Sequence, residues 1–478
     1  MLIKKENRII AADGYTYSHP SQYPFGANNQ YDYGEARSNK RFSKTLVNGL
    51  QGLMNEYWTT PISKLEIDKA EILAKLQDID FDRTGWDIIL NEYNGFLPVS
   101  IKAVKEGTLL PNGNAMFTIE LSKPDDRIFW IVSWLEDFLM KVWYTCNVGT
   151  ISFYVKKMLM QMASLTSDTP FVNYQYINFG DRGSSTPESA KVGSVPHLIM
   201  FNSTETTSAL EYIIDNYNVE LSDADKITAT IPASEHSTIT SWGRDREFDF
   251  VHNMLEKYKH RALIACVGDS YDIYKFTDKV TSGYLKEKIE SNDYPNFVIR
   301  PDSGCAVEVI DRMLDIMERN NVAYTTNSKG YKVFNCYKIL WGDGITMETM
   351  EDILSTMILR KYSTENFVFG SGGFLMTQHD RDTLGFAIKC SSIEFSDGTS
   401  RDVFKDPITA PNKVSKKGRV VACINENGEY TTCLESEIPV NSTNALHLVF
   451  ENGKLVNPET FFEIRDRANN ELLKELEN

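Results

Sequence analysis

The residues of this sequence that could do chemistry stand where short apolar runs end. His236 follows one such run, beside the carboxylate of Glu235 and the hydroxyls of Ser237 and Thr238. Histidine titrates near neutral pH, and catalytic histidines commonly have charged or polar neighbours. The composition around His236 is therefore compatible with a catalytic role and with a structural one.

A glycine-rich stretch, 370–373, follows another apolar run and precedes a predicted helix. Free backbone N–H groups and the helix dipole favour a phosphate group at such a position. Phosphate sites after a late strand are also common in α/β barrels. The alternative is an ordinary tight turn, and we favour the phosphate site.

Two further features are compatible with a sugar phosphate as ligand. Asp302, within the sequence RPDSG, could cap a turn or accept hydrogen bonds from sugar hydroxyls. The segment 381–419 has eight Lys and Arg residues against five Asp and Glu residues, in a chain whose net charge is -16. Such a local excess of positive charge is what a polyphosphate ligand would require.

Seven apolar runs carry these residues at their ends. The runs are 174–180, 195–201, 227–232, 261–268, 296–301, 338–342 and 366–371. They are rich in β-branched and aromatic residues, as strands buried on both faces are. Helix-like stretches such as 208–217 and 306–319 separate them, which predicts strand–helix units and a parallel sheet. We predict a closed α/β barrel of about seven parallel strands, with an open doubly wound sheet as the alternative.

The two ends of the chain differ from this central part. Residues 1–173 and 388–478 mix helix-like and strand-like segments, and we predict that they build a second α+β domain beside the barrel domain, 174–387. Asn-Gly pairs at 427–428 and 452–453 separate short β-like segments, which predicts two hairpins.

The overall composition excludes several classes of protein. Hydrophobic residues make up 42% of the 478 residues, which excludes global disorder. The acidic balance argues against a general nucleic-acid or anionic-membrane binder. The seven cysteines lack metal-site spacing and predict reduced thiols in a cytoplasmic protein. No signal peptide is evident, and the most apolar window, 128–144, is interpreted as a buried amphipathic helix.

Several long stretches in a fixed order resemble the nicotinamide phosphoribosyltransferase family of type II phosphoribosyltransferases. They are DGY (13–15), FGDRGSS (179–185), IPASEHSTITSWG (231–243), DSYDIY (269–274), IRPDSG (299–304), GDG (342–344), FGSGG (369–373), FKDP (404–407) and PNKVSKKGR (411–419). The resemblance implies that nicotinamide mononucleotide and diphosphate are made from nicotinamide and 5-phosphoribosyl 1-diphosphate. It also implies Mg²⁺, ATP as a co-substrate, and a homodimer whose two active sites are shared between subunits.

The resemblance assigns roles to individual residues. Phe179 and Tyr15, the latter from the partner subunit, would enclose the pyridine ring, and Glu205 would face the carboxamide. Asp302 and Arg300 would hold the ribose. The nucleotide and its 5′-phosphate are assigned to Gly342, Asp343, Gly373 and Arg381, and the phosphates or diphosphate to Arg37, Arg182, His236, Lys389 and Lys405.

The same resemblance implies that ATP phosphorylates His236. Asp272 or Asp269 would orient this histidine, so the expected catalytic residues are His236, Asp302 and Asp272. No protein cage for a metal is visible in the sequence, as expected for Mg²⁺ carried largely by substrate phosphates.

Two residues depart from the family pattern. Glu205 stands where the family has aspartate, and Asp181 stands where it commonly has tyrosine. Glu205 keeps a carboxylate that can accept an amide N–H and would repel the nicotinate anion, which predicts a preference for nicotinamide. Asp181 adds negative charge beside Arg182 and could weaken diphosphate binding. The alternatives are a nicotinate phosphoribosyltransferase, a catalytically weak nucleotide-binding relative, and a general ATPase.

Overall fold

The computed structural model describes the chain except residues 1–6, 38–40, 170, 292, 410–413 and 478. The chain divides into two compact units. The first, called the antiparallel unit below, comprises Met1–Thr150, Tyr212–Val219 and His379–Glu471. The second, called the parallel unit, comprises Ile151–Glu211, Glu220–Gln378 and Leu472–Asn478. N-terminal and C-terminal parts of the chain thus both belong to the first unit, although 472–478 belong to the second, and the main changes between units at 150 and 379 lie away from the predicted 173 and 388.

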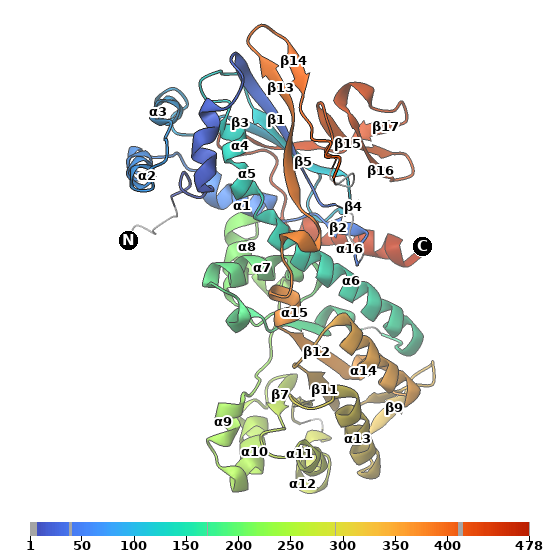
Figure 1. Ribbon diagram of the computed structural model, residues 1–478. Helices are drawn as coiled ribbons and strands as arrows, with labels where there is room; N and C mark the ends of the chain where they lie inside the picture. The colour runs from blue at the N-terminus through green and yellow to red at the C-terminus, as the bar shows by residue number, and fades with distance from the viewer. Residues whose placement is uncertain (1–6, 38–40, 170, 292, 410–413, 478) are drawn as a thin grey trace. The chain divides into compact units, whose positions relative to one another are not determined.

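The antiparallel unit is built on a seven-stranded sheet in the order β14-β13-β1-β5-β3-β18-β19, in which every neighbouring pair is antiparallel (Figure 1). The strands are β14 (Ser400–Asp402), β13 (Ala387–Phe395), β1 (Ala27–Glu35), β5 (Ala115–Leu121), β3 (Val99–Ala103), β18 (His447–Glu451) and β19 (Lys454–Leu455). Helices α1 (Leu50–Trp58), α2 (Lys64–Leu76) and α3 (Arg83–Glu92) belong to the same unit.

The apolar window 128–144 does not form one helix. It is divided among α4 (Ile131–Trp134), α5 (Glu136–Leu139) and the first residues of α6 (Val142–Thr166). Two of its indole rings are buried, as expected: those of Trp130 and Trp134 pack on Trp86 with ring centroids 5.5 and 5.4 Å away. Among the helices of the described residues, none is long and apolar enough to cross a membrane.

Both predicted hairpins are confirmed. In the first, β15 (Val420–Asn425) pairs with β16 (Tyr430–Leu434), and in the second β18 pairs with β19. Gly428 and Gly453 have φ values of 80° and 81°, which glycine adopts without strain.

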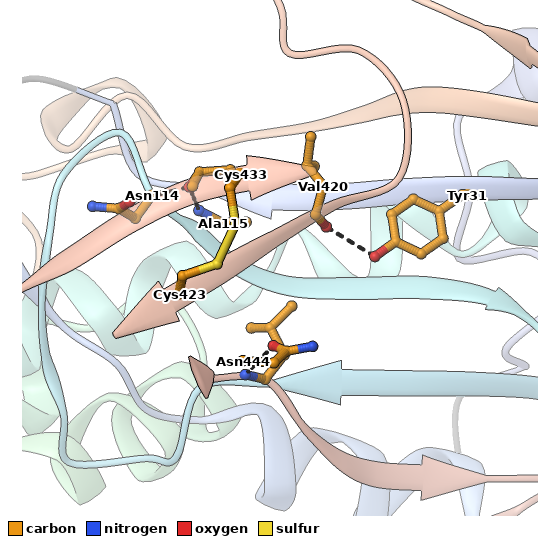
Figure 2. Close-up of a disulfide and its surroundings, with 9 residues drawn as sticks. Tyr31, Asn114, Ala115, Val420, Cys423, Cys433 and Asn444 are labelled. Atoms are coloured by element: carbon orange, nitrogen blue, oxygen red, sulfur yellow. Dashed lines mark hydrogen bonds between the residues drawn. A yellow bond between two sulfur atoms is a disulfide. The ribbon is translucent and has the colours of Figure 1, made fainter. Parts of the chain in front are cut away.

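A disulfide crosses the first hairpin. Figure 2 shows Cys423 on β15 joined to Cys433 on β16, near Val420, whose carbonyl accepts a hydrogen bond from Tyr31 at 2.8 Å. The prediction that all seven cysteines are reduced thiols is therefore wrong for this pair. Cys423 and Cys433 lie ten residues apart and flank a predicted turn, a pattern that CxxC and metal-site spacings do not include.

Reducing this disulfide is expected to lower the free energy of unfolding by about 2–3 kcal/mol, because the closed loop is short and its closure restricts the unfolded chain only moderately. Chemical unfolding of the wild type with and without dithiothreitol, and of Cys433→Ser, measures the change. Cys305→Ser is the control, since Cys305 is an exposed free thiol. A midpoint that is insensitive to both reductant and Cys433→Ser would contradict the prediction.

The parallel unit contains a five-stranded parallel sheet in the order β6-β12-β11-β8-β7 (Figure 1). The strands are β6 (Tyr176–Asn178), β12 (Phe367–Ser371), β11 (Tyr337–Trp341), β8 (Asn296–Arg300) and β7 (Leu263–Val267). Connecting helices include α10 (Glu247–Lys257), α11 (Ile273–Val280), α12 (Gly283–Ile289), α13 (Ala306–Arg319) and α14 (Met347–Leu359). Five of the seven predicted runs thus form strands.

The run 195–201 is a correction to the prediction, because it ends a helix, α7 (Pro187–Met200), instead of forming a strand. The helix begins with a capping box between Thr186 and Ser189 and with Pro187 in its first turn. Continuous apolar runs do not distinguish a buried helix from a buried strand. His197 is fully buried in this helix, where its Nε2 lies 3.0 Å from the carbonyl oxygen of Ser203, and burial lowers its pKa to about 4.

The run 227–232 does not form a regular strand either, yet two irregular segments, 202–205 and 229–234, bond to the edges of the parallel sheet. Glu205 N donates to Asn178 O on β6 at 3.0 Å, and Ala265 N on β7 donates to Pro232 O at 2.9 Å. The two segments also bond to each other, from Ala229 N to Asn202 O at 3.0 Å. Backbone hydrogen bonds through these two segments therefore join β6 and β7, the two edges of the parallel sheet, into a ring.

Candidate active site

A polar cavity of about 430 Å³ lies at the carboxyl ends of the parallel strands. It collects residues that follow β6, β8, β11 and β12. The predicted site residues among its lining are Phe179, Arg182, Arg300, Asp302, Gly342, Asp343 and Gly373. Residues that follow different parallel strands meet at one edge of the sheet, which is why residues far apart in sequence share this cavity.

The ring of Phe179 rests on the backbone of two neighbouring strands. A Cβ atom on Gly370 would lie 2.1 Å from this ring, and one on Gly342 would lie 3.3 Å from it. The backbone of Phe179 is also held, because its N–H donates to Ser371 O at 2.9 Å. The glycines in the predicted FGSGG and GDG stretches therefore make room for this aromatic ring.

Arg300 and Asp302 form the charged centre of the cavity. Arg300 Nη2 lies 3.4 Å from Asp302 Oδ2. Burial raises the pKa of Asp302, Arg300 opposes this, and the nearby carboxylates of Asp269 and Asp343 add to the rise. Arg300 Nε is buried and has no hydrogen-bond partner among the described residues. This guanidinium thus has one unsatisfied donor beside the cavity.

His236 is the first residue of α9 (His236–Thr240) and is held by Asp269. Its Nε2 lies 2.9 Å from Asp269 Oδ1, and the other oxygen of Asp269 accepts a hydrogen bond from Ser303 at 2.6 Å. The histidine side chain is 47% exposed, while that of Asp269 is 8% exposed. A buried, hydrogen-bonded carboxylate of this kind fixes the orientation of an accessible imidazole.

Asp272, the other predicted partner of His236, has a different position. It caps α11, where its Oδ1 accepts from the backbone N–H groups of Tyr274 and Lys275 at 3.0 Å each. Of the two aspartates considered from the sequence, the structure thus pairs Asp269 with the histidine, and Asp272 stabilises a helix start.

The glycine-rich stretch after β12 lines the polar cavity, but the helix that follows is short. This helix, α15 (Gly373–Met376), spans four residues. Gly372, Gly373 and Gln378 line the cavity. Any phosphate here would be bound by backbone N–H groups and side chains, with little contribution from a helix dipole.

Glu205 lines a second cavity, of about 250 Å³, inside the ring of the parallel unit. Apolar side chains, including Ile177, Val298 and Leu340, make up most of its lining. Thr230 also lines it and donates a hydrogen bond from Oγ1 to Glu205 Oε1 at 2.7 Å. Sequence analysis missed Thr230 because it lies in an apolar run predicted to be a strand.

Phe179 belongs to the lining of one cavity and packs against residues that line the other. It lines the polar cavity and also packs against the buried cluster that includes Val298 and Leu340. An aromatic ring at this place can contact a planar ligand on one side and the apolar interior on the other.

The other predicted site residues belong to the antiparallel unit. Tyr15 is 67% exposed, in the 3₁₀ helix Gly14–Ser21. Arg37 Nε lies 3.1 Å from Glu35 Oε1, Arg381 Nη2 lies 3.0 Å from Asp382 Oδ1, and Lys389 Nζ lies 3.8 Å from Glu136 Oε1. The backbone N–H of Lys405 donates to Ser415 Oγ at 3.0 Å. Within the basic segment 381–419, residues 410–413 lie outside the described residues.

Comparison with known proteins decides the family. Residues 174–454, more than half of the chain, match the model of the nicotinate phosphoribosyltransferase (NAPRTase) family. The chain belongs to the nicotinate phosphoribosyltransferase family. Residues 7–101 match a second model, the N-terminal domain of nicotinamide phosphoribosyltransferase.

Curated relatives match the chain over nearly its whole length. A protein of Xanthomonas campestris named nicotinamide phosphoribosyltransferase is 37% identical, over 97% of this chain and 98% of its own. One of the same name from Acinetobacter baylyi is 26% identical over 98% of each chain.

Solved structures support the same α/β fold. Nicotinate-nucleotide pyrophosphorylase from Pyrococcus furiosus superposes with a TM-score of 0.64, at 14% identity, over 100% of this chain and 99% of its own. Human nicotinic acid phosphoribosyltransferase does so with a TM-score of 0.54, also at 14% identity, over 97% of this chain and 93% of its own. At these identities the likeness concerns the fold alone.

Proposed function

We propose that this protein is a nicotinamide phosphoribosyltransferase, which makes nicotinamide mononucleotide and diphosphate from nicotinamide and 5-phosphoribosyl 1-diphosphate. The observation that carries the proposal is the polar cavity, where Phe179, Arg300 and Asp302 lie together with the glycine backbone of the neighbouring strands. Relatives that match nearly the whole chain are named for this activity.

The proposed reaction breaks the bond between C1 of the ribose and diphosphate and forms a bond from C1 to the ring nitrogen of nicotinamide. Positive charge develops on the sugar and negative charge on the leaving group. Asp302 would accept hydrogen bonds from the ribose hydroxyls, and the cations of Arg182 and Arg300 would stabilise phosphate groups. The ring nitrogen needs to be positioned, not deprotonated, and stacking on Phe179 would position it.

Mg²⁺ is part of the proposal, as a metal held mainly by the substrate phosphates. No group of three metal-ligating side chains occurs in the described part of the chain, so the protein itself would supply one or two carboxylates at most. Asp302 and Asp343 line the polar cavity and are the residues that fit this role. When bound, the metal would neutralise charge on the diphosphate.

We further propose that ATP phosphorylates His236. In this step Nδ1 forms a bond to the γ-phosphorus of ATP, the bond from that phosphorus to the bridging oxygen breaks, and ADP leaves with the electron pair. Nε2 keeps its proton and donates a hydrogen bond to Asp269. Water later hydrolyses the phosphohistidine to phosphate. The contact between Nε2 and Asp269 supports this assignment of the two ring nitrogens.

A homodimer is part of the proposal, and the residues of the antiparallel unit have roles in it. Tyr15 of a second copy would cover the other face of the pyridine ring. Arg37, Arg381, Lys389 and Lys405 would bind phosphate or diphosphate. These assignments follow from the family resemblance, and the exposed position of Tyr15 is compatible with them.

Product formation by the purified protein tests the proposed function. The assay contains nicotinamide, 5-phosphoribosyl 1-diphosphate and Mg²⁺, with and without ATP, and parallel reactions contain nicotinate. We expect nicotinamide mononucleotide and diphosphate in equal amounts, and more of both with ATP. Product from nicotinate alone would favour the rival nicotinate activity, and no product from either base would favour a nucleotide-binding relative.

Gly370→Ala is expected to raise the KM for nicotinamide at least tenfold with little change in the KM for 5-phosphoribosyl 1-diphosphate. Its new Cβ would lie 2.1 Å from the ring of Phe179, which must then move away. Gly183→Ala is the matched control, because nothing lies within 4 Å of the added Cβ there. Steady-state kinetics measure both constants, and equal KM values for nicotinamide in the two variants would contradict the placement of the ring.

A further inference from the structure

We propose that Thr230 is a positioning residue that holds Glu205 in place and thereby sets the preference for a carboxamide over a carboxylate on the base. The inference rests on the proposed function, because it gives Glu205 the role of contacting the base. It concerns a residue that neither the sequence motifs nor the family resemblance singled out.

In the hydrogen bond between these two side chains, Thr230 is the donor and Glu205 is the acceptor. Thr230 Oγ1 lies 2.7 Å from Glu205 Oε1, and an ionised carboxylate can only accept, so the hydroxyl donates. The bond occupies one oxygen of Glu205 and leaves Oε2 to accept an N–H of the carboxamide. Bonds to a charged acceptor are about twice as strong as neutral ones.

Few side chains of the cavity lining could bond to Glu205, and the ammonium group of Lys338 among them donates to the backbone oxygen of Glu365 at 2.6 Å. The lining is mainly aliphatic and aromatic, with Ile177, Ile231 and Val368 among the neighbours. Glu205 and Thr230 are both exposed to solvent, so the bond between them matters for where it directs the carboxylate, not for unusual strength. Thr230 therefore contributes much of what orients this carboxylate.

The backbone holds both residues of the pair. Glu205 N donates to Asn178 O at 3.0 Å, and Ala229, next to Thr230, donates to Asn202 O at 3.0 Å. Threonine has few χ1 rotamers, whereas glutamate has one rotatable bond more than aspartate. The hydrogen bond from Thr230 thus restricts the additional side-chain rotation of Glu205. An aspartate at this position would not have that additional rotation.

Selectivity follows from this restriction. A carboxylate held at one place accepts from a neutral carboxamide and repels an anionic carboxylate placed there. A carboxylate free to rotate would be less well placed to accept from the carboxamide. It would also repel nicotinate less, because it could turn away from the anion. Loss of the Thr230 hydroxyl should weaken nicotinamide binding and, at the same time, weaken the exclusion of nicotinate.

The test compares Thr230→Val, which removes the hydroxyl and keeps the shape, with Thr230→Ser, which keeps the hydroxyl. We expect Thr230→Val to raise the KM for nicotinamide about tenfold with little change in kcat. The ratio of kcat/KM for nicotinamide to that for nicotinate should fall by more than tenfold. Thr230→Ser should stay close to the wild type in both quantities.

Thr228→Val is the matched control, because Thr228 lies on the same segment and its hydroxyl donates to the backbone oxygen of Asn202 at 3.3 Å. Its base selectivity should remain that of the wild type. An unchanged selectivity ratio in Thr230→Val would overturn the inference, and so would an equal change in Thr228→Val, since that would indicate a general disturbance of the segment.

A double-mutant comparison separates this inference from the proposed function. If Glu205 contacts the base and Thr230 acts through it, Thr230→Val should have no further effect on base selectivity in Glu205→Ala. If Glu205→Ala leaves base selectivity unchanged, the assigned role of Glu205 fails, and with it the inference. If the wild type turns over neither base, calorimetric binding of nicotinamide to wild type and Thr230→Val decides, and equal affinity overturns the inference.

Discussion

His236→Ala is expected to abolish the stimulation of nicotinamide mononucleotide formation by ATP, a loss of about 10²- to 10⁴-fold in the ATP-dependent rate. The variant lacks the nitrogen that would form the bond to phosphorus. Product formation without ATP should persist, because the residues proposed to bind the base and ribose are unchanged. Rate measurements at matched substrate concentrations with and without ATP give the coupling directly.

Labelled phosphate distinguishes a role in phosphoryl transfer from a role in folding. With γ-labelled ATP, the wild type should become labelled on histidine, and His236→Ala should not. Asp269→Asn should reduce labelling, because the amide holds the imidazole less well than a carboxylate does. His252→Ala is the matched control, since His252 contacts Lys288 on a different pair of helices. ATP stimulation that survives in His236→Ala would contradict the proposed phosphohistidine.

Glu205→Gln is expected to raise kcat/KM for nicotinate by up to about three powers of ten. Two like charges ~4 Å apart in an effective dielectric of ~20 repel by about 4 kcal/mol, which sets the upper limit of the change. Glutamine has the same length, and its single carbonyl oxygen can accept from the carboxamide while its NH2 group donates to the Thr230 hydroxyl, so kcat/KM for nicotinamide should fall much less. Kinetics of both bases with both proteins provide the ratio.

Asp181→Asn is the control for this second prediction. It removes another carboxylate, next to Arg182, which lines the polar cavity. A change in diphosphate binding in this variant would affect the reactions of both bases equally. The ratio of kcat/KM for nicotinamide to that for nicotinate should therefore not change. A wild type that prefers nicotinate, or a Glu205→Gln variant with the wild-type ratio, would contradict the electrostatic argument.

The sequence predicted the strands that carry the polar cavity, because β6, β8, β11 and β12 are apolar runs bounded by glycine or polar residues. It failed at 195–201, where the apolar run belongs to a helix whose start signals, Thr186 and Pro187, lie eight or more residues upstream. At 227–232 the run has the composition of a strand, but the segment bonds to its neighbours at only a few positions.

The candidate site shows the same division. Motifs identified residues such as Arg300 and Asp302 because their neighbours along the chain are distinctive. Contacts between distant segments, such as those of Thr230 with Glu205 and of Ser303 with Asp269, produce no motif or regular spacing in the sequence from which they could be predicted. The choice between Asp269 and Asp272 likewise depended on which carboxylate the start of α11 engages.

The two irregular segments of the ring have a consequence for how such an enzyme can change over evolution. Glu205 and Thr230 lie on segments held by isolated backbone hydrogen bonds, whereas Arg300 ends the regular strand β8, and Asp302 and Gly342 directly follow regular strands. On the proposed assignments, substitutions that alter the choice of base therefore fall where only a few isolated backbone hydrogen bonds have to be preserved. The residues proposed to bind the ribose and phosphates, anchored in the sheet, could then remain constant while substrate preference diverges among descendants of one ancestral chain.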